Sequence, residues 1–185
     1  MSYQSWGEVL ARSEVDGPAL ASSVTATSIL SAQSKVQLPQ GSFFFVGKIL
    51  RVRAVGRIST TTGPPTITFD IRFGSVVVFN GGAVTTVASV TNKTWWLDVL
   101  LTCRAVGAGG SATANMFGVG NLTSSAVVGS TGGAANTAML PDSAPAVGTS
   151  FDPGTSQIVD LFATWSASNA SNSVQCHEYV LEALN

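Results

Sequence analysis

The most informative feature of this sequence is an alternation of apolar and polar residues with a period of two. Every second residue is apolar in residues 66–73 (TITFDIRF) and through most of residues 94–106 (TWWLDVLLTCRAV). Successive side chains of a β-strand point to opposite faces, and aromatic and β-branched residues favour strands, so this pattern predicts half-buried strands. The strands expected on this basis cover residues 25–30, 35–38, 43–58, 66–73, 75–79, 94–106, 111–119, 125–128, 157–167 and 174–184.

Turn-forming residues separate these segments. Pro39-Gln40-Gly41, residues 60–65 (TTTGPP) and Asp152-Pro153-Gly154 are typical of reverse turns, and Asn80-Gly81 is a hairpin signal. Strands do not alternate with helices, and no internal repeat is present. The sequence therefore predicts an all-β fold, a jelly-roll β-sandwich.

The N-terminal residues differ from the rest of the chain. Residues 3–12 are compatible with one or two helical turns that place Trp6, Val9 and Leu10 on one side, and Gly17-Pro18 then interrupts any regular structure. We therefore expect an extended N-terminal arm over residues 1–24 and the jelly-roll domain over residues 25–185. The arm is expected to bury its apolar side chains against a neighbouring subunit.

The alternation also divides the strand residues between a core and an outer face. The residues expected in the core are Phe69, Ile71, Trp95, Leu97, Val99, Leu101 and Trp165. The opposite faces are not purely polar, because Trp96, Leu100 and Phe162 lie on them. Large apolar side chains on outer faces indicate a contact surface with another subunit.

Composition narrows the possible functions. Only 10% of the 185 residues are charged, against about a quarter in an average protein, and the formal net charge is −1. The basic residues are not clustered, which argues against nucleic-acid binding. No apolar run is long enough to span a membrane as a helix. With so few ionisable groups, we do not expect an enzyme.

Few residues offer metal, thiol or acid–base chemistry. Cys103, Cys176 and His177 are a poor metal site. Cys176 and His177 are adjacent on a predicted strand, so their side chains point to opposite faces and cannot easily bind the same ion. A disulfide between the two cysteines is the alternative to two buried free thiols. Nucleophilic catalysis by a serine with His177 lacks a supporting motif. Asp70, Asp98 and Asp160 lie on predicted strands, where a pair of them could act in glycoside hydrolysis. The alternative is that they form cross-strand ion pairs with arginines, and we prefer this interpretation. No cofactor is expected.

Several segments make the chain similar to a known family. They are ARSEVDGPAL (11–20), GKILRVRAVGRIST (47–60), TFDIRFGSVVVFNGGA (68–83), TWWLDVLLTCRAVG (94–107) and VDLFATWSASNASNSVQCHEYVLEALN (159–185). They resemble small virion-associated proteins of tailed bacteriophages and prophages. The expected architecture is also similar in outline to the jelly-roll cement proteins that sit as trimers on phage heads, a likeness at the level of fold only.

The resemblance implies a capsid decoration (cement) protein, made in the host cytoplasm and located on the capsid surface of the virion. Its expected partners are further copies of itself, as a homotrimer, and the major capsid protein. The alternative is a tail or fibre-associated module that binds a host receptor or glycan. The residues expected to make the subunit contacts are Trp6, Val9, Leu10, Arg51, Arg53, Arg57, Asp70, Arg72, Trp96, Asp98 and Arg104.

Overall fold

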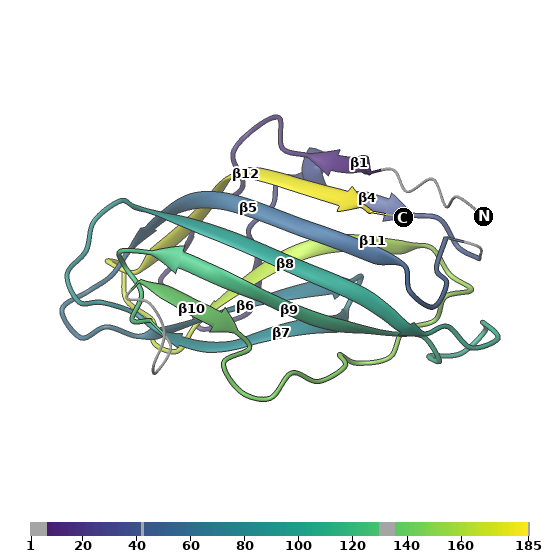
Figure 1. Ribbon diagram of the computed structural model, residues 1–185. Coiled ribbons are helices and arrows are strands. Elements are labelled where there is room, and N and C mark those ends of the chain that lie inside the picture. Colours follow the sequence, from purple (N-terminus) through teal and green to yellow (C-terminus); the bar gives the residue numbers. More distant parts are fainter. Residues whose placement is uncertain (1–6, 42, 130–135, 185) are drawn as a thin grey trace.

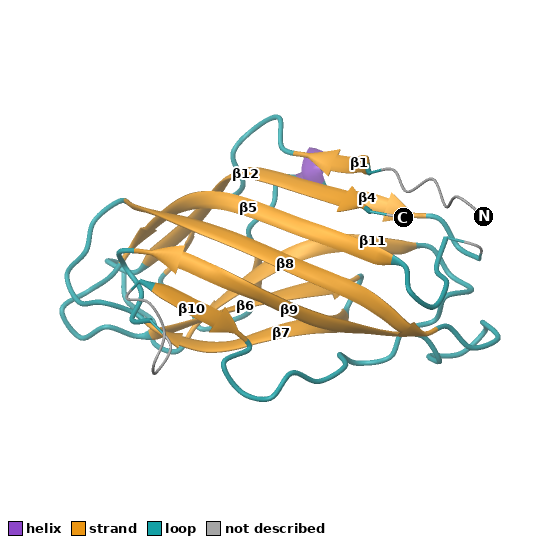
Figure 2. Ribbon diagram, in the orientation of Figure 1, coloured by secondary structure: helices purple, strands orange, loops and turns teal. Residues whose placement is uncertain are grey.

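The alternating segments fold into two antiparallel β-sheets that pack face to face (Figures 1 and 2). The computed structural model describes residues 7–41, 43–129 and 136–184. Its strands are β1 (Glu8–Arg12), β2 (Leu20–Ala21), β3 (Thr27–Ser28), β4 (Val36–Leu38), β5 (Ile49–Ser59), β6 (Thr66–Phe73), β7 (Val76–Thr85), β8 (Lys93–Ala105), β9 (Asn115–Ser124), β10 (Thr137–Leu140), β11 (Gln157–Trp165) and β12 (Ser173–Ala183), with one short 3₁₀ turn at Ala32–Ser34. The predicted all-β jelly-roll sandwich is confirmed.

The two sheets differ in size. The larger sheet has the order β1-β12-β5-β8-β9-β10, with β2 also paired to β12. The smaller sheet has the order β3-β11-β6-β7, with β4 also paired to β11. Figure 1 shows β12, β5, β8, β9 and β10 side by side in front of β11, β6 and β7. Within the described residues, no helix is long and apolar enough to cross a membrane.

Most long strands match the predicted segments. β7 and β9 extend beyond the predicted residues 75–79 and 111–119, and the strand predicted over 125–128 is wrong, because these residues form a turn with a single bridge at Val127. The segment predicted from residue 43 becomes β5 only at Ile49, because a turn precedes it in which Lys48 N donates to Phe45 O. Asn80-Gly81 does not form the expected hairpin; it lies inside β7, where the register with β6 shifts. Asn80 Oδ1 accepts a hydrogen bond from Gly82 N, and Gly82 has a φ of +75°, so the signal marks a β-bulge.

The N-terminal segment lies along its own sandwich. β1 and β2 both pair with β12, and Ser13 Oγ accepts a hydrogen bond from Tyr179 N. The helical turns predicted over residues 3–12 are wrong for the described part, which is a strand from Glu8, because β12 offers its free edge to the chain at this point. Residues 1–6, with Trp6, lie outside the described residues. The boundary between residues 24 and 25, and contact of the arm with another subunit, stay predictions.

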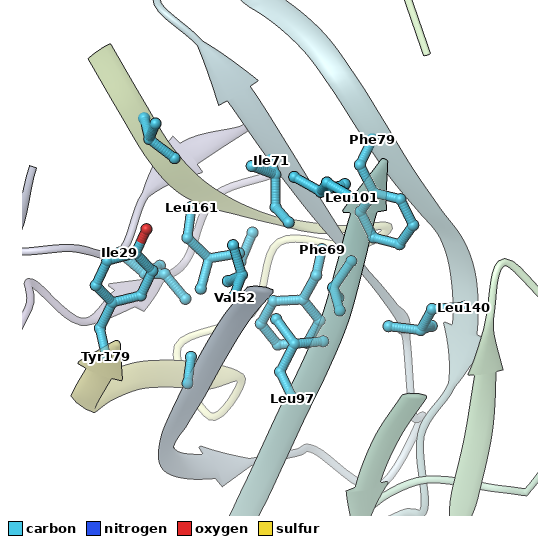
Figure 3. Close-up of a cluster of buried hydrophobic side chains, with 14 of the residues drawn as sticks. Ile29, Val52, Phe69, Ile71, Phe79, Leu97, Leu101, Leu140, Leu161 and Tyr179 are labelled. Atoms are coloured by element: carbon cyan, nitrogen blue, oxygen red, sulfur yellow. The ribbon is translucent and has the colours of Figure 1, made fainter. Parts of the chain in front are cut away.

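The core lies between the sheets and contains the predicted residues. Phe69, Ile71, Trp95, Leu97, Val99, Leu101 and Trp165 are each at most 1% exposed. The rings of Phe69 and Trp95 have centroids 5.1 Å apart and so join the two sheets. Figure 3 shows side chains of both sheets, among them Phe69 and Leu97, interleaved in this core. Close packing of this kind makes the loss of a large side chain costly.

Replacing each of two adjacent tryptophans tests this assignment. Trp95→Ala is expected to lower the free energy of unfolding by about 3–5 kcal/mol, because it leaves a cavity in the core. Trp96→Ala, its matched control on the outer face, is expected to cost about 1 kcal/mol or less. Urea unfolding followed by circular dichroism measures both. Equal losses would show that the two faces of β8 are assigned wrongly.

Candidate functional site: the outer face of the larger sheet

The outward side chains of β5, β8 and β9 form a surface that we call the outer face. Along β8, Trp95 points into the core, whereas Trp96 points outward and is 46% exposed. In the sheet register Trp96 lies between Val55 of β5 and Thr123 of β9. Because its strand is hydrogen-bonded on both sides, the backbone at Trp96 is held in place and directs the side chain outward.

Exposed apolar side chains continue beyond Trp96. Leu100 on β8 is 41% exposed, and Met139 on the edge strand β10 is 54% exposed. They border a shallow hollow of about 440 Å³. The hollow is lined by Arg51, Asp98, Leu100, Val119, Gly120, Asn121, Met139 and Leu184. Large apolar groups mixed with ordered polar ones distinguish this face from an ordinary solvated surface.

Two ion pairs order the arginines of β5. Arg51 donates from Nε to Asp98 Oδ1 over 2.9 Å, and its Nη2 bonds the second oxygen of the same carboxylate. These hydrogen bonds raise the pKa of Arg51. Arg53 Nη2 lies 3.0 Å from Glu182 Oε1 on β12. The pairs are half-exposed and contribute little to stability, but the bidentate one fixes the position of both side chains.

The other two arginines of the outer face bind neutral groups. Arg57 Nη1 donates to Asn92 O and to Thr94 Oγ1, each over 3.1 Å. The guanidinium of Arg104 lies 4.7 Å from the centre of the Phe117 ring, a cation–π contact. Neither has an ion pair with a described carboxylate.

The structure brings together only some of the predicted contact residues. On the outer face lie Arg51, Arg53, Arg57, Trp96, Asp98 and Arg104. Asp70 and Arg72 pair with each other on the smaller sheet, where Arg72 stacks on the Phe162 ring. On β1, Val9 is exposed and Leu10 packs partly against the core. Whether any of these residues makes a subunit contact stays a prediction.

Sequence reasoning missed other members of this face. Glu182, Asn121 and Met139 lie on it because of strand pairing. Asn121 and Met139 belong to a stretch rich in Gly, Ala, Ser and Thr, where the hydrophobic alternation is weak. Glu182 occupies an alternate position of the last strand, but the sequence does not reveal that this strand neighbours β5.

The groups weighed for catalysis occupy structural positions. Asp70 and Asp160 are buried on the outside of the smaller sheet, and Lys35 Nζ lies 2.8 Å from Asp160 Oδ2. His177 Nδ1 lies 2.9 Å from Asp16 Oδ1. Among the described residues no group of three or more His, Cys, Asp or Glu side chains is arranged to hold a metal ion.

The two cysteines are free and buried. Burial raises the pKa of the Cys176 thiol to about 12, from an ordinary value of 9.0, and raises that of Cys103 as well. A neutral, buried thiol is a poor nucleophile and a poor metal ligand. The structure thus agrees with the interpretation of Cys103 and Cys176 as two buried free thiols, and it contains no disulfide between them.

Thiol accessibility provides a direct test. At pH 8 the folded protein is expected to leave both cysteines unmodified by Ellman's reagent, whereas two thiols per chain react in denaturant. Because the thiol of Cys176 ionises near pH 9 when unfolded and near pH 12 when folded, stability should fall as pH rises between these values. Rapid labelling of one thiol in the folded protein would contradict this burial.

Comparisons with known proteins do not place the chain in a family. No family model and no curated protein matches it. The solved structures similar to it include the CBM2 module of the Lactobacillus casei BL23 phage J-1 evolved Dit (9% identity, TM-score 0.39, covering 99% of this chain and 98% of that one). Peanut lectin (8%, 0.36, 98% of each chain) and the Bauhinia forficata lectin in complex with GalNAc (11%, 0.38, 98% and 99%) are also similar. Likenesses this distant carry no argument about function.

Proposed function

We propose that this chain is a carbohydrate-binding module of a phage virion and that it recognises host-surface glycans through the outer face. The observation that carries the proposal is the indole of Trp96, held half-exposed on a regular strand among ordered polar side chains. This is the alternative function considered from the sequence. Binding without catalysis agrees with the aspartates and thiols described above, which are engaged in ion pairs or buried.

An exposed indole suits a sugar because both have an apolar face and polar groups at the edge. The C–H groups on one side of a pyranose ring can pack against the flat indole, where many weak dispersion contacts add up. The half of the Trp96 side chain that stays in water forgoes about 25 cal/mol of burial free energy for each Å² of apolar area, part of which a bound ring restores. The position of Trp96 therefore favours a ligand with a flat apolar surface.

The polar groups around Trp96 can satisfy sugar hydroxyls. Asp98 supplies carboxylate oxygens, Asn121 supplies both a donor and an acceptor, and Thr123 and Thr137 supply hydroxyls 3.3 Å apart. Arg51 already holds Asp98 in place, so little side-chain entropy is lost when a ligand binds. The outer face thus combines a fixed aromatic platform with a fixed set of hydrogen-bonding groups.

A capsid decoration protein is the second candidate, favoured by the apolar side chains on the same face. Leu100 and Met139 border the hollow without offering hydrogen bonds to a sugar, and a protein partner would bury them. In that case a homotrimer of this chain would contact the major capsid protein on the virion surface. Burial of apolar area at about 25 cal/mol per Å², less the cost of association, would stabilise the shell.

Substitution of Trp96 tests the glycan proposal. Trp96→Ala is expected to lower affinity for array-bound host glycans at least tenfold, because the stacking platform is lost. Ile158→Ala is a matched control, since Ile158 is equally exposed (46%) but lies on the smaller sheet. Binding that survives Trp96→Ala, or an array without any bound glycan, would overturn the proposal.

Substitution of Leu100 tests the second candidate. If the face docks on a capsid, Leu100→Asp is expected to reduce occupancy on stripped particles at least tenfold, because it places a charge in the buried apolar contact. Quantitative gel analysis of sedimented particles measures occupancy, and sedimentation equilibrium measures the oligomeric state. Unchanged occupancy and a monomer at all concentrations would contradict the decoration role.

A further inference from the structure

Arg57 differs from the other two arginines of β5. Arg51 and Arg53, on the same strand and the same face, are each paired with a carboxylate. Arg57 is exposed, and the only hydrogen bonds of its side chain with the described residues go from Nη1 to a carbonyl and a hydroxyl oxygen. Its Nε and Nη2 donors therefore remain available in a side chain whose position is already fixed.

The register places Arg57 beside the proposed aromatic platform. Arg57 faces Thr94 on β8, and Val55, two residues earlier, faces Trp96. Diagonal neighbours on adjacent antiparallel strands lie about 7–8 Å apart, within reach of a long side chain. A sugar ring stacked on Trp96 would thus carry its substituents to the guanidinium of Arg57.

The surroundings of Arg57 are mostly uncharged. Beyond it, at the end of the sandwich, three loops border an open hollow of about 470 Å³. Its lining is uncharged and rich in hydroxyls, which include those of Thr61, Ser89 and Ser171. Asn172, fully buried, links two of these loops by accepting a hydrogen bond from Thr61 N. The nearest described carboxylate in the register is that of Glu178 on β12, which faces Val55 and is a diagonal neighbour of Arg57. It forms no ion pair with Arg57, and its charge reduces the attraction for a bound anion without cancelling it.

We propose that Arg57 makes this surface selective for anionic glycans, by binding a carboxylate or phosphate on the sugar that stacks on Trp96. The planar fork of a guanidinium matches the two oxygens of either group. This inference rests on the proposed function and adds the charge of the ligand to it. Because the contact is exposed, its contribution weakens as ionic strength rises.

A glycan array of matched pairs tests the inference. Each uronic-acid, sialylated or phosphorylated oligosaccharide is printed beside its carboxyl-reduced or dephosphorylated counterpart, so that the array also distinguishes carboxylate from phosphate. The wild-type protein is expected to prefer the anionic member at least tenfold in low salt. Calorimetric titration with the best-bound pair then gives the affinities in solution.

Arg57→Gln is expected to remove this preference while retaining binding of the neutral member. The matched control is Arg12→Gln, which removes the same charge from the exposed edge strand β1. Circular dichroism melting confirms that both variants are folded. If neutral and anionic members bind equally and Trp96→Ala abolishes both, the role of Arg57 is refuted and the glycan proposal stands. If no glycan binds, the proposed function itself fails.

Discussion

The unbroken ladder between β5 and β8 is the constraint on which the rest of the structure depends. Ten consecutive residue pairs, from Ile49 and Thr102 to Ile58 and Lys93, join these strands without a register shift. A shift of β8 by one residue against β5 would turn every side chain of β8 to the opposite face, exposing Trp95 and burying Trp96 and Asp98. The core and the outer face are therefore fixed by the same set of backbone hydrogen bonds.

Glycine at one position of this ladder shows how tightly it is packed. A Cβ added to Gly56 would lie 1.8 Å from Gln175 O on β12 and 2.8 Å from the ring of Trp95. The backbone of β5 thus approaches β12 and the indole more closely than any other residue allows. This contact couples the central strand to the C-terminal strand and, through Trp95, to Phe69 of the smaller sheet.

The sequence predicts what depends on alternation and misses what depends on pairing between distant segments. The seven predicted core residues are all buried. They could be predicted because the period of two assigns each side chain to a face from its sequence neighbours alone. Which strands adjoin is a long-range property, so the pairings of Asp98 with Arg51 and of Glu182 with Arg53 emerge only in the folded chain. Residues 8–12 lack a strong period, and their partner β12 lies at the other end of the sequence, so a strand there could not be foreseen.

The pairing of the first and last strands has a mechanical consequence. Glu8 faces Ala183 on the same rung, so a force that separates these two residues acts on one pair of hydrogen-bonded residues at a time. The hydrogen bonds between β1 and β12 would then break one pair after another at low force, instead of all at once. In the order of the sheet, the β5–β8 ladder comes after β12, so the force does not reach it until β1 has separated from β12. A chain pulled from both ends would thus open first at β1, before the outer face is disturbed.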